Sequence, residues 1–164
     1  MHEGRRRRTA ISICTLLVAY GVASGGASAH PFSGWTGKSG PFRWQAKTVS
    51  CGAVSGEPNR VAAHSRWVSS PANGYQRAVF TRQIWNETAQ SWTTVASKRR
   101  TTKNTPFEGQ DVILHWTQFF PVMAREEGKR SRDVVAFAWR RDRKGADRTV
   151  FARRVLLASC VVGS

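Results

Sequence analysis

Short segments rich in Val, Thr and aromatic residues recur along this chain from Gln45 onward, and clusters of turn-forming residues separate them. Such regular spacing is typical of strands joined by turns. No helical stretch separates consecutive strands, which excludes the alternation that builds a parallel sheet. We therefore predict an all-β fold, an antiparallel immunoglobulin-like β-sandwich of about seven strands. The predicted strands are Gln45–Cys51, Arg60–Ser69, Gln76–Trp85, Ser91–Ser97, Asp111–Phe120, Asp133–Arg141 and Arg148–Val162.

The connections between the predicted strands carry their own signals. Asn86–Gln90 has the length of a hairpin loop. Lys98–Asn104 is predicted to be a basic connection, and Arg125–Arg132 a charged excursion that favours a short helix. The unbroken apolar run Val134–Ala138 predicts a central strand that is covered on both faces.

The first 29 residues have the pattern of a secretory signal peptide. Four arginines precede the apolar run Ala10–Tyr20, and a tract of small residues ends in Ala27-Ser28-Ala29. This apolar run is about half as long as a bilayer span requires, although an N-terminal membrane anchor is the alternative. We expect cleavage near Ala29, a mature chain without a transmembrane segment, and a secreted, extracellular protein.

The expected mature chain divides into an arm and a domain. Residues 30–44 are rich in Gly, Ser and Pro and contain four aromatic residues, so we predict an extended N-terminal arm there. Residues 45–164 carry the predicted strands and form the β-sandwich domain. Aromatic side chains of the arm are expected to pack on that domain.

The cysteines of the chain also point to export. Removal of the signal peptide takes away Cys14 and leaves Cys51 and Cys160. Two cysteines in an exported chain most simply form one disulfide, and two free thiols are the alternative. A disulfide between these positions would join the first predicted strand to the last.

The charge of the chain is strongly positive. Lys and Arg number 26 against 10 Asp and Glu, a net charge of +16, and the signal peptide accounts for four of the arginines and one of the acids. The mature chain therefore carries 22 − 9 = +13. A hydrophobic content of 40% excludes a disordered polycation. A basic folded domain of this kind attracts anionic partners.

Three sequence motifs resemble a group of small exported proteins. These motifs are Thr48-Val49-Ser50-Cys51-Gly52, the strands Arg77–Phe80 and Ile84–Asn86 answered by Trp92–Val95, and a cysteine four residues before the end of the chain. Together they are similar to small exported actinobacterial proteins with immunoglobulin-like β-sandwich folds and no assigned activity. The resemblance covers most of Gln45–Cys160, and it implies a fold without implying a chemistry.

One candidate chemistry depends on the expected mature N-terminus. Cleavage after Ala29 makes His30 the first residue, and a terminal histidine offers an amino and an imidazole nitrogen to Cu(II). Copper-dependent polysaccharide oxygenases use such a terminus on immunoglobulin-like sandwiches, with a second histidine that His64 or His115 would supply here. The alternative for both is an ordinary, partly exposed strand histidine, since neither has a companion at metal-ligand spacing.

Hydrolytic chemistry finds little support in the sequence. There is no Gly-x-Ser-x-Gly nucleophile motif. Acidic residues are scarce, and Glu126-Glu127 lie beside Arg125 and Lys129, which is typical of a solvated surface. We therefore expect a non-catalytic binding or interaction module.

The basic residues fall into clusters that could attract an anionic polymer or the cell-envelope surface. One cluster comprises Lys98, Arg99, Arg100 and Lys103, and a second comprises Lys129, Arg130 and Arg132. The candidate binding residues surround the last predicted hairpin: Arg140, Arg141, Arg143, Lys144, Arg148, Arg153 and Arg154. Arg140 and Arg141 cannot share a sheet face, because adjacent strand residues point to opposite sides. Dispersed solubilising charge is the alternative.

The seven tryptophans allow carbohydrate stacking, but core or hairpin packing is the more ordinary role.

Overall fold

The computed structural model describes residues 35–53, 56–104, 109–141 and 149–163, all within a unit that spans residues 31–164. The predicted signal peptide and His30 therefore lie outside the described residues. Within the described ranges the fold is all-β apart from one 3-10 helix, η1 (Ala124–Glu126). No helix in this part of the chain is long and apolar enough to cross a membrane.

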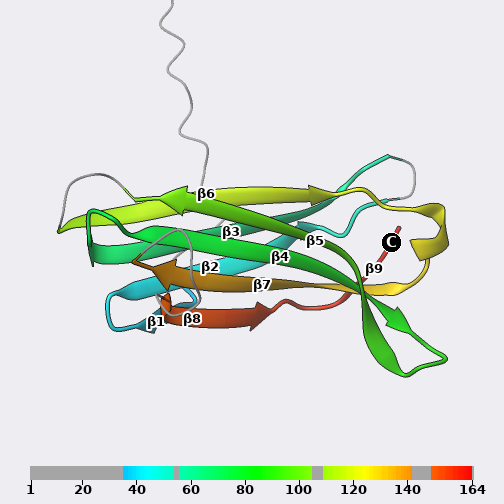
Figure 1. The fold of residues 1–164 in the computed structure, drawn as a ribbon. Helices are drawn as coiled ribbons and strands as arrows, with labels where there is room; N and C mark the ends of the chain where they lie inside the picture. The colour runs from blue at the N-terminus through cyan, green and yellow to red at the C-terminus, as the bar shows by residue number, and fades with distance from the viewer. Residues whose placement is uncertain (1–34, 54–55, 105–108, 142–148, 164) are drawn as a thin grey trace, which may run out of the picture. The chain divides into compact units, whose positions relative to one another are not determined.

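The described strands form two antiparallel sheets that pack together, which confirms the predicted β-sandwich (Figure 1). The strands are β1 (Gly37–Ser39), β2 (Phe42–Ser50), β3 (Asn59–Ser70), β4 (Tyr75–Asn86), β5 (Ser91–Lys103), β6 (Gln110–Phe120), β7 (Arg130–Arg140), β8 (Thr149–Leu156) and β9 (Cys160–Val161). Sheet A has the order β1-β2-β3-β6, and sheet B has the order β5-β4-β7-β8, with β9 paired to β7.

The seven long strands alternate between the sheets, in pairs except for β6. The chain runs through β2 and β3 in sheet A, β4 and β5 in sheet B, β6 in sheet A, and β7 and β8 in sheet B. In an immunoglobulin-like sandwich these positions correspond to strands A, B and E of one sheet and C, C′, F and G of the other. The predicted fold class therefore holds at the level of strand order.

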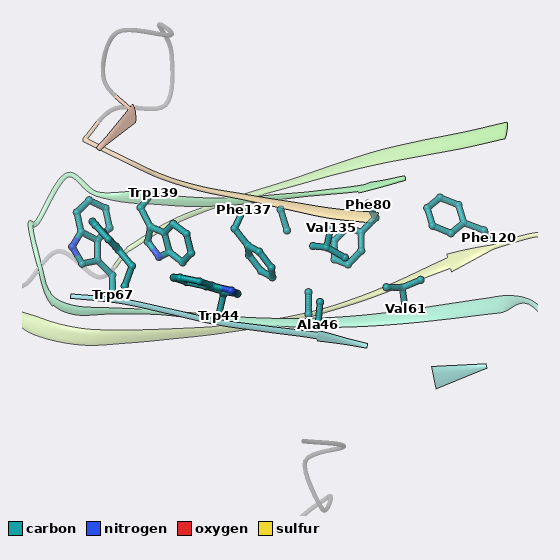
Figure 2. Packing of buried hydrophobic residues seen from close by; sticks show 12 residues of the cluster. Trp44, Ala46, Val61, Trp67, Phe80, Phe120, Val135, Phe137 and Trp139 are labelled. Carbon is teal, nitrogen blue, oxygen red and sulfur yellow. The ribbon is translucent and has the colours of Figure 1, made fainter. Parts of the chain in front are cut away.

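Alternate residues of the strands build the core between the sheets (Figure 2). On β7, Val135, Phe137 and Trp139 are each at most 1% exposed. Trp139 contacts Phe42 and Trp44 of β2, with ring centroids 5.1 and 6.1 Å apart. Two aromatic residues of the expected N-terminal arm thus belong to a core strand.

The strand boundaries differ from the predicted ones in four places. The single strand predicted at Arg148–Val162 is instead two strands, β8 and β9, with residues 157–159 between them. The first long strand begins at Phe42 rather than Gln45, and β1 pairs with its start. The basic connection predicted at Lys98–Asn104 is wrong, because β5 continues to Lys103. β7 begins at Arg130, so η1 and a turn occupy only the first part of the predicted excursion. In β5 nearly every residue is exposed, so the strand lacks the alternation that marks a half-buried segment.

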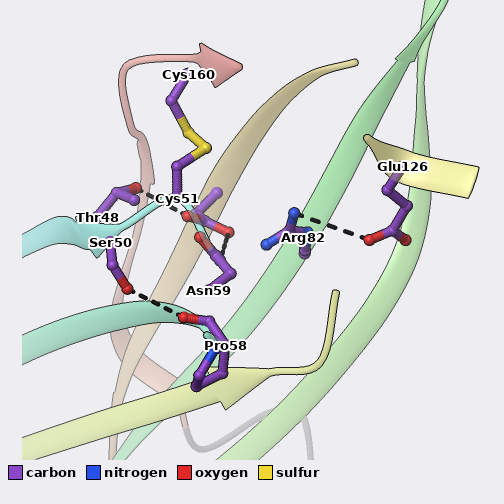
Figure 3. The surroundings of a disulfide bond; sticks show 9 residues. Thr48, Ser50, Cys51, Pro58, Asn59, Arg82, Glu126 and Cys160 are labelled. Carbon is purple, nitrogen blue, oxygen red and sulfur yellow. Dashed lines mark hydrogen bonds and ion pairs between the residues drawn. A yellow bond between two sulfur atoms is a disulfide. The ribbon is translucent and has the colours of Figure 1, made fainter. Parts of the chain in front are cut away.

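A disulfide joins Cys51 and Cys160, as predicted (Figure 3). Cys51 directly follows β2 of sheet A, while Cys160 lies in β9 of sheet B. Their Cα atoms are 6.2 Å apart across a sequence separation of 109 residues. The disulfide therefore links the two sheets near the beginning and the end of the described chain.

Candidate anion-binding surface

The outer face of sheet B is built from residues that lie in register across its four strands. One row across β5, β4, β7 and β8 consists of Arg99, Val79, Ala136 and Arg154. The neighbouring row consists of Thr101, Arg77, Ala138 and Ala152. Paired residues of antiparallel strands project to the same side. Because the intervening Ala78 and Phe137 belong to the core, both rows face away from it.

Seven cationic residues occupy this outer face, which we call the basic face. They are Arg77, Arg99, Lys103, Arg130, Arg132, Arg140 and Arg154. The described acidic residues lie elsewhere: in loops, in η1, on sheet A, or, for Asp133, on the core side of β7. Apart from Arg140, the cations of the basic face form no ion pair with a described carboxylate.

The arginines of the basic face are close enough to repel one another. Partial burial, with the positive charges of Arg140 and Arg99, lowers the pKa of the Arg77 guanidinium below its ordinary value. Partial burial and the charge of Arg154 likewise lower the pKa of Arg132. A guanidinium nevertheless remains protonated at neutral pH. The fold thus holds like charges together, and an anion bound there would relieve their repulsion.

Small side chains lie between the cations. In the row that contains Arg99 and Arg154, the arginines stand on the edge strands β5 and β8, and Val79 and Ala136 separate them. Neighbouring strands lie about 4.8 Å apart, so the Cα atoms of these arginines are about 14 Å apart. A ligand that reaches both must extend across the sheet, which suits a polymer better than a single small anion.

Aromatic residues mark the end of the basic face next to the β4–β5 hairpin. Trp85 and Trp92 pair across the hairpin, with ring centroids 5.3 Å apart and planes inclined by 62°. The Arg132 guanidinium lies 4.3 Å from the Trp92 ring, and that of Arg130 lies 5.9 Å from both rings. Cation–π contact of this kind holds the two arginines against the indoles.

The structure separates the candidate binding residues of the last predicted hairpin. Arg154 is exposed on the basic face, whereas Arg153 pairs with the core residue Phe137 and lies on the other side of β8, 5.7 Å from the Trp44 ring. Arg140 is on the basic face but only 5% exposed. Arg141 is exposed after the end of β7. Arg143, Lys144 and Arg148 lie outside the described residues.

The two described histidines of the copper hypothesis are neighbours on sheet A. His64 on β3 and His115 on β6 are register partners, and their rings meet edge to face with centroids 4.1 Å apart. His64 is 7% exposed, while His115 is exposed. The described ranges contain no group of three His, Cys, Asp or Glu residues that could hold a metal ion.

A second charged cluster is buried beneath the disulfide and was missed in the sequence (Figure 3). Arg82 is 0% exposed, and its guanidinium lies 3.8 Å from the Glu126 carboxylate. Asp133 accepts hydrogen bonds from the Thr48 hydroxyl at 2.8 Å and the Asn59 amide at 3.0 Å. Burial raises the pKa of Asp133 above its ordinary value. The cluster is shielded from solvent, so its role is structural.

The raised pKa of Asp133 predicts a pH-dependent stability. Its carboxyl group keeps its proton to a higher pH in the folded protein than in the unfolded chain, where the pKa is about 3.8. This contribution is fully present below pH 3.8 and is lost as the pH rises through the folded pKa. Wild-type protein should therefore lose stability relative to Asp133→Asn as the pH rises from about 4. Urea unfolding of both proteins at several pH values tests this, and the opposite trend would contradict it.

Comparisons with known proteins identify no family for this chain. No family model matches the chain, and no curated protein is similar to it in sequence. Among solved structures, the sporulation control protein Spo0M from Bacillus subtilis is similar at a TM-score of 0.34 and 14% identity. The match covers 73% of this chain and 50% of that one, so the chain spans about half the length of Spo0M. A likeness this distant leaves the function to be inferred from the residues themselves.

Proposed function

We propose that this protein is an exported, non-catalytic binding module whose basic face holds anionic polymers or the anionic surface of the cell envelope. The observation that carries the proposal is the convergence of six cations on the outer face of sheet B, none of which forms an ion pair with a described carboxylate: Arg77, Arg99, Lys103, Arg130, Arg132 and Arg154. A polyanion that binds there releases its counterions, so its affinity should fall as salt rises.

The outer face of sheet A makes a useful contrast. Part of its positive charge is already engaged, because Arg66 pairs with Asp111. The contrast supports the basic face, rather than the whole surface, as the site where an anionic ligand would gain most.

Two pairs of adjacent arginines provide a matched test of this proposal. Arg99→Gln with Arg154→Gln removes two charges from the basic face, while Arg100→Gln with Arg153→Gln removes two charges from the other side of the same strands. We expect the first variant to bind heparin about tenfold more weakly, since each exposed ionic contact contributes about 0.5 to 1 kcal/mol. The second variant should bind nearly as the wild type does. Binding is measured by titration at several salt concentrations.

The outcome separates a defined surface from general charge. Equal losses of heparin affinity in both variants would mean that net charge alone attracts the polymer, and the proposal would be wrong. Thermal unfolding of each variant controls for damage to the fold, because Arg153 lies over the Trp44 ring.

A further inference from the structure

An open pocket of about 460 Å³ adjoins the basic face at the base of the β4–β5 hairpin. Ile84, Trp85 and Val95 form its apolar lining. Polar lining comes from the hairpin, from Lys129 between η1 and β7, and from Arg130 at the start of β7. Its volume lies within the usual range for small-molecule sites, about 300 to 1,000 Å³.

The pocket combines two kinds of lining group. Trp85 contributes an aromatic residue to the lining. The amide of Asn86, the hydroxyl of Thr88 and the carboxylate of Glu87 offer hydrogen-bonding groups beside it. A sugar ring matches this combination, because it has an apolar face of C–H groups and a rim of hydroxyls that both donate and accept.

The charged residues that line the pocket indicate which class of sugar it would bind. Lys129 and Arg130 provide two cations, and Glu87 provides one carboxylate. The cations suit a sugar carboxylate, whereas Glu87 suits hydroxyl donors and would repel any anion placed directly beside it, a doubly charged phosphate more than a carboxylate. A uronic acid carries both kinds of group on one ring.

The hairpin that carries the polar groups is held in shape by its own hydrogen bonds. The Ala89 N–H donates to Asn86 Oδ1 at 3.0 Å, and Gln90 Nε2 donates to the Glu87 carbonyl oxygen at 2.6 Å. On the other wall, the Arg130 guanidinium lies 5.9 Å from the Trp85 ring. These hydrogen bonds fix the turn of the hairpin before a ligand arrives, which reduces the entropy lost on binding.

We propose that this pocket is a sugar subsite that binds one uronic acid unit of an acidic polysaccharide, while neighbouring units lie along the basic face. The subsite rests on the proposed function, because Arg130 belongs both to the pocket and to the basic face. A sugar subsite explains why an aromatic and polar pocket lies at the end of a cationic surface.

Two tryptophan variants test the subsite. Trp85 lines the pocket, whereas Trp92 is its partner in the aromatic pair and is absent from the described lining. Trp85→Leu and Trp92→Leu therefore remove the same packing contact, but only the first removes the pocket wall. Affinities of the full mature protein are measured by calorimetry for oligogalacturonate, linear polyphosphate and a single-stranded oligonucleotide, all of equal charge.

We expect Trp85→Leu to weaken oligogalacturonate binding about tenfold and polyphosphate binding less than twofold. Trp92→Leu should change both less than threefold. As a second variant that leaves the hairpin packing intact, Lys129→Gln should weaken oligogalacturonate more than polyphosphate. Equal effects of Trp85→Leu and Trp92→Leu, or no effect of Lys129→Gln, would overturn the subsite.

The ligands also separate failure of the subsite from failure of the proposed function. If polyphosphate and oligogalacturonate bind equally and only the basic-face variant weakens them, the subsite is wrong and the basic face stands. If Trp85→Leu weakens the oligonucleotide more than oligogalacturonate, the pocket stacks bases instead of sugars. If none of the three polyanions binds to the wild type, the proposed function itself is wrong.

Discussion

Replacing both Cys51 and Cys160 by serine should lower the free energy of unfolding by about 4 to 5 kcal/mol. The disulfide closes a loop across a sequence separation of 109 residues, and in the chain-entropy model a loop of this length restricts the unfolded chain strongly. Single domains are stabilised by only about 5 to 15 kcal/mol in total. The loss would therefore remove a large share of the stability.

Urea unfolding, followed by tryptophan fluorescence, measures this effect on the oxidised wild type and the double serine variant. Wild type treated with a reductant is the matched control, because it breaks the same bond without changing a side chain. Titration of the denatured, unreduced mature protein should find no free thiol, because Cys51 and Cys160 are joined. An unchanged unfolding midpoint in the serine variant would show that β9 is held in place without the bond.

Arg82→Met should destabilise the protein by about 3 to 5 kcal/mol. The substitution removes a fully buried cation and leaves Glu126 and Asp133, both buried, without its charge. Breaking a buried ion pair from one side is costly, because the remaining charge stays desolvated and unpaired. Methionine has similar length and adapts to irregular gaps, so the loss of packing is small by comparison.

A double variant separates the charge effect from the packing effect. Glu126→Gln keeps an oxygen that can accept the Met123 N–H, as Glu126 does at 3.3 Å in the native protein. Combining it with Arg82→Met should therefore recover part of the lost stability. Thermal and urea unfolding of the two single variants and the double variant give the coupling free energy. Additive effects would contradict the view that these two charges depend on each other.

The sequence predicted most strands closely and missed the last part of β5, which is exposed on both sides. β3, β4 and β6 match their predicted ranges within one residue at each end, because turn-forming residues such as Pro58, Pro71 and Pro121 flank them. The sequence predicted a connection in place of the last part of β5, because the adjacent charged residues Lys98, Arg99 and Arg100 leave no apolar face there. An edge strand that is exposed on both sides leaves little hydrophobic pattern in the sequence.

The alternation of core-facing and outward-facing residues along β4 could have predicted that Arg82 is buried. No such pattern in the sequence could have predicted the basic face. Arg82 lies two residues after Phe80 and two before Ile84, both buried, so the alternation of β4 already points it into the core. The row from Arg99 to Arg154 depends on the order and register of four strands. Those pairings arise from contacts between residues far apart in the chain, and local spacing does not encode them.

The same exposed charges on β5 have a consequence for how copies of this protein meet. β5 is an edge of sheet B, and an unpaired edge offers backbone groups to the strand of another molecule. Lys98 and Arg100 lie on one side of β5, and Arg99 and Lys103 lie on the other. Two such edges that approach each other would bring cations opposite cations on both sides. The exposed charges that made the last part of β5 hard to predict therefore also protect the protein from edge-to-edge aggregation at high concentration.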